Sequence, residues 1–551
     1  MSAFGGLRGI SSVPARAALA LPALLAVLLY LPVQRNALLS DDHSLLYAFH
    51  GAKAPLELAG RVARTFVEGV GAPSSQYRPV TMATFALNVA SGDADPLAWH
   101  LVNLALHAAN AALLSSVALR MGRGAQGSAA AALVAGTALA LLPPAVEAIA
   151  WPAARFDALA LFFSLAAARL AMASDRPLDR PAVAGLAAFA LALGSKEAGV
   201  LALPLAGALL WQREAVRHGL ARGALAAVPA LLPWLAVAAA YFALRVAIFG
   251  DPFRFFPGAA PMGELASGAF VGNLGGVFAW WGRAFPAERA SIVLVVAIAA
   301  LAALALAAAA REEARRIEFV PMLAATLAAL AMLGAQWQWP AHGEGGRVLY
   351  APGAIALLAL VVAFRAASRM LRFSALAFAV AMLVASAGLA HRAVERWVAA
   401  GESMRALGAA LAATAASLPA GEFAFVVTAD HLGPVPFARN AQLSLLLPPV
   451  APFALSSRVA VQVVPDLPQW PGLFARDAVG RLQREPLVDA LRAPPPPPRN
   501  PPYRLPDRYF CWDTRERALR PVVLDVAPDA RNWDAAWAQA LASPACAQVQ
   551  P

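Results

Sequence analysis

Apolar residues fall in long runs along most of the first 390 positions, and short polar segments separate the runs. Many runs are about twenty residues long, the length that an α-helix needs to cross the hydrocarbon core of a membrane. The pattern predicts about eleven membrane-spanning helices. We place them at residues 17–34, 97–120, 129–149, 156–174, 181–195, 197–212, 224–249, 289–310, 318–336, 348–366 and 372–391.

The composition agrees with this class. Hydrophobic residues make up 60% of the chain and charged residues only 14%, whereas a soluble protein is nearer a quarter charged. The formal net charge of +11 does not indicate nucleic-acid binding, because the basic residues lie mostly in short loops between the apolar runs. We therefore expect the lipid bilayer, and no nucleic acid, as a partner.

The basic residues also predict the orientation. Loops on the cytoplasmic side of a membrane carry an excess of Lys and Arg. With the N-terminus in the cytoplasm, every predicted inner loop is Arg-rich, and an odd number of spans puts everything after residue 391 outside. We expect a multi-pass protein of the bacterial inner (plasma) membrane. The arginines concerned are Arg8, Arg16, Arg120, Arg123, Arg169, Arg176, Arg180, Arg213, Arg217, Arg222, Arg311, Arg315, Arg316, Arg365, Arg369 and Arg372.

One further segment, residues 265–285, is apolar enough to cross. Crossing would turn the loop at 311–316 outward, against the positive-inside rule. The segment also holds several glycines and the pair Trp280–Trp281, which suits a membrane interface. We interpret it as an interfacial or re-entrant helix on the outer side; the alternative is a twelfth span.

The character of the chain changes after residue 400. Residues 422–430 and 458–464 have the pattern of strands, residues 507–526 that of two strands joined by a turn, and residues 531–541 that of a short helix. We predict a small soluble α/β domain at 401–551, following a membrane domain at 1–400. Its extracytoplasmic location allows a disulfide between Cys511 and Cys546, the two cysteines of the chain.

Charged and polar groups beside a membrane mostly serve a function. In this topology five groups of them face the outer side. The first outer loop, about 35–95, carries two groups, and three later loops carry one each. The residues are Asp41, Asp42 and His43; Tyr77 and Arg78; Glu147, Arg155 and Asp157; Lys196 and Glu197; and His342, Glu344, Arg347 and Tyr350.

Each group also has a purely structural interpretation. Asp41 could cap the helix that starts near residue 42, Arg78 could pair with an outer carboxylate, and Glu147 could cap a helix. Lys196 and Glu197 could pair with each other at a turn. Glu344 and Arg347, three residues apart, could form a local ion pair.

A further polar set lies inside one apolar run. His100, Asn103, His107 and Asn110 are spaced by three, four and three residues, so they share one helical face. Polar groups in lipid find partners on neighbouring helices, and we interpret this face as a packing contact. A metal site is disfavoured, because seven residues between the histidines correspond to about 10 Å of helix rise.

The motifs in this order resemble the GT-C superfamily of membrane glycosyltransferases. They are DD after the first span, then YRP, WHLVNLALHAANAALL, PPAVEAIAWPAARFD, SKE and RVLYAPG. The likeness is to the protein O-mannosyltransferase-like branch, including the membrane part of TMTC-type proteins, and covers roughly residues 17–391. Those proteins carry tetratricopeptide repeats at the C-terminus, whereas this chain shows no 34-residue period, which leaves the acceptor open.

The resemblance implies transfer of a sugar from a polyprenyl-phosphate carrier to a hydroxyl on a protein, lipid or glycan. It implies an essential acidic residue in the first outer loop, here Asp42 or Asp41. A carboxylate can take the proton of the attacking hydroxyl, and cations must hold the leaving phosphate. Arg78, Arg347 and Lys196 are the candidates, with His43, Tyr77, Glu147, Glu197 and Glu344 in support. Some relatives use a divalent metal (Mg or Mn), and Asp41 and Asp42 could hold one.

Two other functions fit the same spans. A transporter or flippase of a lipid-linked sugar would show a repeat and polar groups near the midplane, and we see no convincing repeat. A non-catalytic scaffold would lack the first-loop carboxylates, which this chain has.

Overall fold

The computed structural model describes residues 14–52, 54–68, 76–122, 126–174, 176, 178–250, 269–285, 289–336, 339, 343–439, 441, 444–447, 449–451, 453–464, 507–524, 539 and 542–546. These residues form two compact units. The helical unit consists of residues 1–34, 62–84 and 100–395. The sheet unit consists of residues 35–61, 85–99 and 396–551.

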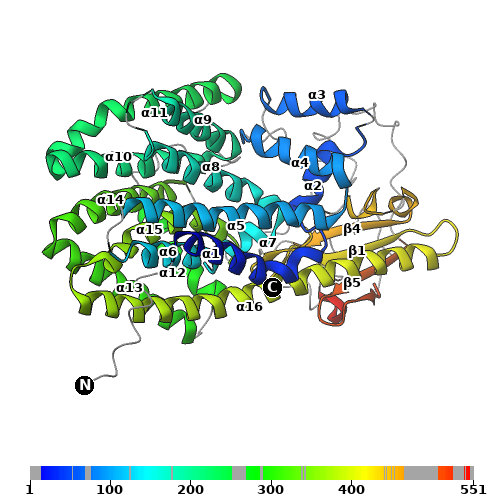
Figure 1. Ribbon diagram of the computed structural model, residues 1–551. Coiled ribbons are helices and arrows are strands. Elements are labelled where there is room, and N and C mark those ends of the chain that lie inside the picture. The colour runs from blue at the N-terminus through cyan, green and yellow to red at the C-terminus, as the bar shows by residue number, and fades with distance from the viewer. Residues whose placement is uncertain are drawn as a thin grey trace. The chain divides into compact units, whose positions relative to one another are not determined.

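Helices make up most of the described chain (Figure 1). In chain order they are α1 (Ala15–Tyr30), α2 (Asp41–Phe49), α3 (Pro55–Thr65), α4 (Pro79–Gly92), α5 (Pro96–Met121), α6 (Ser128–Ala140), α7 (Ala145–Ala150), α8 (Arg155–Ala171), α9 (Arg180–Ser195), α10 (Ala202–His218), α11 (Leu220–Phe249), α12 (Ala269–Ala284), α13 (Arg289–Arg311), α14 (Glu313–Gln336), α15 (Tyr350–Leu360) and α16 (Arg369–Ser417). Short 3₁₀ turns include η4 (Glu197–Leu201) and η6 (Gly346–Leu349).

Seven described helical segments are long and apolar enough to cross a membrane. Each overlaps one of the expected spans. The other four expected spans, at 129–149, 156–174, 181–195 and 197–212, hold shorter helices of 6 to 17 residues. The chain is thus a helical protein with several membrane spans. The seven segments are 15–35, 96–121, 220–249, 289–311, 313–334, 346–365 and 369–417.

Prolines explain one departure from the prediction. A single helix over 129–149 is wrong, since α6 ends at Ala140 and α7 starts at Ala145. Pro143 and Pro144 lie between them and cannot donate the backbone hydrogen bonds that a continuous helix needs. The break puts Glu147 on a separate short helix. By contrast, α16 has no proline and runs unbroken from Arg369 to Ser417, through the boundary expected at 400.

Within the helical unit, α8 packs against α9 and α10 packs against α11. The apolar core between these helices includes Phe189 and Trp234, whose ring centroids lie 5.6 Å apart. Gly219 joins α10 to α11 with a φ of 77°, a conformation that glycine adopts without strain. These contacts hold α8 and α9 together, and the N-terminal end of α8 and the C-terminal end of α9 carry several of the predicted site residues.

The sheet unit contains a four-stranded sheet in the order β4-β1-β5-β6. Its strands are β1 (Ala424–Ala429), β4 (Val459–Val464), β5 (Arg508–Asp513) and β6 (Ala518–Val522). β1 is parallel to both β4 and β5, and β5 and β6 form an antiparallel hairpin. All six residues of β1 are buried, as expected of a central parallel strand. The strands predicted at 422–430, 458–464 and 507–526 are therefore confirmed.

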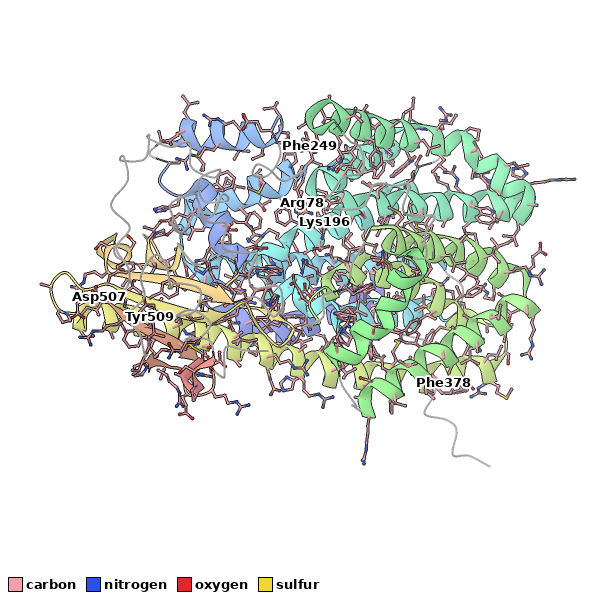
Figure 2. All side chains as sticks on the ribbon, turned by 180° about the vertical axis from the view of Figure 1, so that it is seen from behind. Arg78, Lys196, Phe249, Phe378, Asp507 and Tyr509 are labelled. Atoms are coloured by element: carbon pink, nitrogen blue, oxygen red, sulfur yellow. A yellow bond between two sulfur atoms is a disulfide. The ribbon has the colours of Figure 1, made fainter. Side chains whose placement is uncertain are left out.

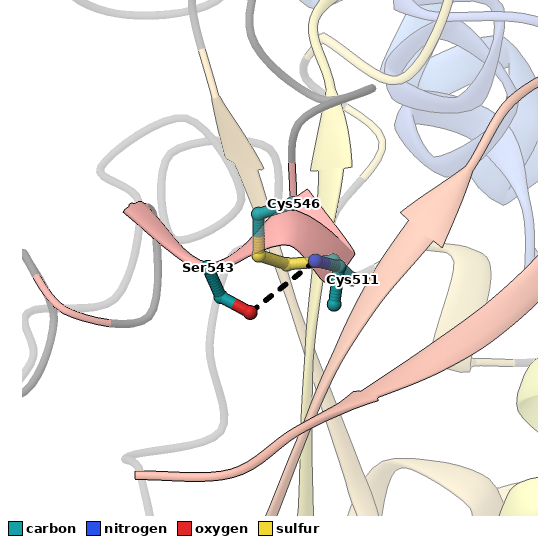
Figure 3. The surroundings of a disulfide bond; sticks show 4 residues. Cys511, Ser543 and Cys546 are labelled. Atoms are coloured by element: carbon teal, nitrogen blue, oxygen red, sulfur yellow. Dashed lines mark hydrogen bonds between the residues drawn. A yellow bond between two sulfur atoms is a disulfide. The ribbon is translucent and has the colours of Figure 1, made fainter. Parts of the chain in front are cut away.

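The two cysteines are joined. Cys511 in β5 and Cys546 form a disulfide with 5.1 Å between their Cα atoms, and the amide of Cys546 donates to the carbonyl of Ser543 at 2.9 Å (Figure 3). The bridge ties the C-terminal end of the described chain to the sheet. Most of the helix predicted at 531–541 lies outside the described residues. The segment predicted at 265–285 carries α12, and whether it crosses the membrane stays a prediction.

Candidate functional site

Arg78 is the residue before α4, in the loop that the sequence singled out. Its guanidinium holds Glu197, the first residue of η4, in a two-point contact: Nη2 lies 2.5 Å from Oε1 and Nε lies 3.1 Å from Oε2. The guanidinium also lies over the ring of Phe156, 4.7 Å from its centroid. Tyr77 beside it donates its hydroxyl to the carbonyl of Phe66 at 3.2 Å. Arg78 is thus buried and rigidly oriented.

Lys196 caps the C-terminal end of α9 and lies near Arg78 (Figure 2). Its ammonium donates to both oxygens of Asp157, in the first turn of α8, at 2.6 and 2.7 Å. Burial lowers the pKa of Lys196, and the carboxylate of Asp157 opposes this shift. Lys196 and Glu197, adjacent in sequence, therefore bind different partners rather than each other.

Arg347 lies in η6 and contacts three carboxylates. It donates to Glu147 and, at 3.0 Å, to Glu344, while its Nε lies 3.9 Å from Asp157. A second oxygen of Glu147 accepts the amide of Gly345 at 2.8 Å. The local pair of Glu344 and Arg347 is present, and Glu147 joins it from a separate helix.

We call these seven residues the ion-pair cluster: Arg78, Lys196, Arg347, Glu147, Asp157, Glu197 and Glu344. It holds three cations and four carboxylates, so it carries an excess of one negative charge when all are ionised. Side-chain exposure is 16% or less for every member. Buried charges persist only when they are paired, and here each cation has a carboxylate partner.

Two buried arginines were given no role in the predicted site: Arg155 was named only as part of an outward-facing group, and Arg245 was not singled out. Arg155, the first residue of α8, donates from Nε to Asn103 at 2.9 Å and from Nη1 to Thr84 at 3.3 Å. Arg245 is fully buried near the end of α11, beside the rings of Tyr241 and Phe249. A charged residue inside an apolar run signals a special role, and this signal could have found Arg245.

The polar face of α5 is a packing contact, as expected. Asn103 donates to the carbonyl of Trp151 at 3.0 Å, and Asn110 donates to that of Ala158 at 2.9 Å. His107 shares a hydrogen bond of 2.5 Å with the hydroxyl of Tyr350. These bonds join α5 to the segment 151–158 and to α15.

The first-loop carboxylates lie in the sheet unit, at the start of α2. Ser40, not Asp41, is the capping residue, and its side chain makes no capping bond. Asp42 is fully buried, and its Oδ2 accepts the amide of Leu39 at 2.8 Å. Asp41 is partly exposed. His43 is buried beside them, with Nε2 3.1 Å from the carbonyl of Leu38, and burial lowers the pKa of His43 to about 4.

The described residues do not assemble a metal site at this loop. Nowhere among them do three or more His, Cys, Asp or Glu side chains come together in a group that could hold a metal ion. One oxygen of Asp42 is already engaged by a backbone amide. Metal dependence stays an open prediction, and no step below uses a metal.

No protein-family profile and no curated protein sequence matches the chain. Among solved structures, it is similar to ArnT from Cupriavidus metallidurans bound to undecaprenyl phosphate, with 13% identity, 80% of this chain and 89% of that chain covered, and a TM-score of 0.39. It is also similar to the oligosaccharyltransferase from Archaeoglobus fulgidus tethered with an acceptor peptide, with 13% identity, 81% and 63% covered, and a TM-score of 0.44.

Proposed function

We propose that this protein is a membrane glycosyltransferase that moves a sugar from a polyprenyl-phosphate donor to a hydroxyl acceptor on the extracytoplasmic side. The proposal joins the motif resemblance to one structural observation, the ion-pair cluster. Its cations are buried, oriented by carboxylates and contributed by loops that the positive-inside rule puts on the outer side. Such a group suits an anionic head at a membrane surface.

Arg78 and Lys196 keep hydrogen-bond donors for a phosphate. Glu197 engages Nε and Nη2 of Arg78, and Nη1 makes no hydrogen bond within the described chain. Asp157 takes two of the three donors of Lys196. The carboxylates hold the cations in place, and the remaining donors can bind phosphate oxygens, which Arg does in a two-point geometry. Arg347, with more carboxylate partners, is a weaker candidate.

The proposed reaction is a single displacement. The acceptor hydroxyl loses its proton to a first-loop carboxylate, Asp41 or Asp42, as its oxygen forms a bond to the anomeric carbon. The bond between that carbon and the phosphate oxygen breaks at the same time, and the polyprenyl phosphate leaves with the electron pair. Attack from the opposite face inverts the anomeric configuration. The donors of Arg78 and Lys196 would stabilise the charge that develops on the phosphate.

The disulfide supports the proposed side. Disulfides persist in oxidising compartments and are rare in the cytosol, and Cys511 is bonded to Cys546 in the sheet unit. We therefore place the sheet unit outside the cytoplasm of a bacterial inner membrane. The protein O-mannosyltransferase-like branch, and hence the sugar, rests on the motif resemblance alone.

The test is transfer by the purified full-length chain in lipid nanodiscs. The substrates are undecaprenyl phosphates linked to radiolabelled mannose, glucose, galactose or arabinose, with hydroxyl-bearing peptides, lipids and glycans as acceptors. Label should move to one acceptor class, and Arg78→Gln should abolish the movement. Arg217→Gln is the matched control, because Arg217 pairs with Glu214 outside the cluster. Failure to transfer, together with donor movement across proteoliposome membranes, would favour the transporter.

A further inference from the structure

The residue before the two first-loop aspartates has an unusual backbone conformation. Ser40 has a φ of 47° and a ψ of −122°, and the amide of Asp42 donates to the carbonyl of Leu39 at 3.0 Å. These values define a type II′ turn over residues 39–42 with Ser40 at its first central position. Glycine dominates that position, because a side chain is strained there. A strained residue persists only where its surroundings enforce the conformation.

Three hydrogen bonds within the sheet unit enforce this turn. The amide of Ser40 donates to the carbonyl of Phe437 at 2.8 Å, and the amide of Phe437 donates in turn to the carbonyl of Asp430 at 2.8 Å. The carboxylate of Asp42 accepts the amide of Leu39 at 2.8 Å. The amides of Leu39 and Ser40 are thus both satisfied. The segment after β1 and the side chain of Asp42 together fix the turn.

Two further contacts of the sheet unit extend this attachment along the loop. Asn36 donates to the carbonyl of Trp397 in α16 at 2.8 Å, and Tyr47 donates to that of Leu447 at 2.7 Å. The first outer loop is therefore held by the C-terminal part of the chain at three separated points.

We propose that Asp41 is the base of the transfer reaction and that Asp42, Ser40 and the backbone of Phe437 are its positioning groups. Asp42 is fully buried and is committed to the amide of Leu39, whereas Asp41 is partly exposed on the turn that these groups hold. This ranks Asp41 above Asp42, the reverse of the order favoured by the sequence. The inference rests on the proposed glycosyl transfer. In it, Asp41 is the reacting residue and Asp42 is a positioning residue.

The test compares five variants of the full-length chain in nanodiscs, with the labelled undecaprenyl-phosphate sugar and acceptor that the wild type uses. Asp41→Asn should lower kcat by about 10²- to 10⁴-fold, the usual contribution of a general base. Asp42→Asn keeps an oxygen for the amide of Leu39 and should lose less than about tenfold. Asp42→Ala cannot accept that bond and should lose on the order of a hundredfold in kcat, at an unchanged KM for the donor.

Ser40→Val is the fourth variant, since a β-branched residue resists positive φ; Ser40→Gly, which adopts the turn freely, is its rescue. Kinetics are measured on the monodisperse folded fraction. A positioning role predicts a low kcat for Ser40→Val and recovery with Ser40→Gly. A merely structural role predicts a lower unfolding temperature for Ser40→Val but an unchanged kcat in the folded fraction.

Three outcomes are distinguishable. If Asp42→Asn is as inactive as Asp41→Asn, Asp42 is the base and the inference fails while the proposed function stands. If Ser40→Val turns over like the wild type, the turn positions nothing. If the wild type transfers no sugar from any donor, the proposed function fails and the catalytic role of the turn fails with it.

Discussion

Asp157 holds Lys196 with both oxygens of its carboxylate, at 2.6 and 2.7 Å from the ammonium nitrogen. The pair joins the start of α8 to the end of α9, two helices that run side by side in the helical unit. It also separates Lys196 from its sequence neighbour Glu197, which binds Arg78. The turn between α9 and η4 is therefore fixed by an ion pair on each side.

Breaking this buried pair from one side should destabilise the protein. Asp157→Asn leaves the ammonium of Lys196 without its charge partner, and we expect a loss of about 3–5 kcal/mol in the free energy of unfolding. Thermal unfolding in detergent measures the change. Glu57→Gln is the control, because Glu57 pairs with Arg61 at an exposed site, where an ion pair contributes about 0–1 kcal/mol. Equal shifts for the two variants would contradict the structural role of the pair.

Arg78→Lys should weaken binding of undecaprenyl phosphate by about tenfold or more. The ammonium of lysine cannot bind both oxygens of Glu197 in the two-point geometry of the guanidinium and also present a further donor to the phosphate. Binding of undecaprenyl phosphate to the nanodisc-embedded protein is the measurement. Arg217→Lys, outside the ion-pair cluster, should bind it like the wild type. Wild-type affinity in Arg78→Lys would remove Arg78 from the donor site.

Glu147→Gln should have the opposite effect. The ion-pair cluster holds four carboxylates against three cations, so its carboxylates compete with an anionic ligand for the donors of Arg347. Removing the charge of Glu147 leaves Arg347 paired with Glu344 at 3.0 Å, so we expect undecaprenyl phosphate to bind several-fold more tightly. A weaker affinity would mean instead that Glu147 is needed to orient Arg347.

His43 should make the protein sensitive to acid. Burial lowers its pKa from 6.5 to about 4, so the unfolded chain binds the proton more readily. The stabilisation is fully present above pH 6.5 and is lost as the pH falls toward 4, by up to about 3 kcal/mol. In His43→Gln, the unfolding temperature should change less with pH over this range than it does in the wild type. If the unfolding temperature of His43→Gln falls with pH as steeply as that of the wild type, other groups cause the acid sensitivity.

Reduction should destabilise the sheet unit selectively. The disulfide closes a loop across a sequence separation of 35 residues, and a bridge of this kind stabilises by about 2–4 kcal/mol. Dithiothreitol should lower the unfolding temperature of the wild type. A variant with Cys511→Ala and Cys546→Ala should already unfold at the lower temperature and not respond to the reductant. Maleimide labelling of the untreated native protein by a membrane-impermeant reagent would show instead that the cysteines are free.

The sequence alone determined the fold class and most of the elements. Runs of apolar residues must be buried in lipid, so their length and spacing located the spans at 289–310 and 372–391, which lie within the helical segments 289–311 and 369–417. Short runs rich in valine located β1 and β4 in the same way. These signals are local, because each depends on the residues of a single element.

Only the tertiary structure decided the pairing of charges. Sequence neighbours suggested that Lys196 would pair with Glu197, yet their partners are Asp157 and Arg78, 39 and 119 positions away. The strain at Ser40 was likewise invisible, because it depends on the carbonyl of Phe437, far along the chain. A charged side chain binds the partner that lies within a few ångströms, and packing, not sequence distance, sets which partner that is.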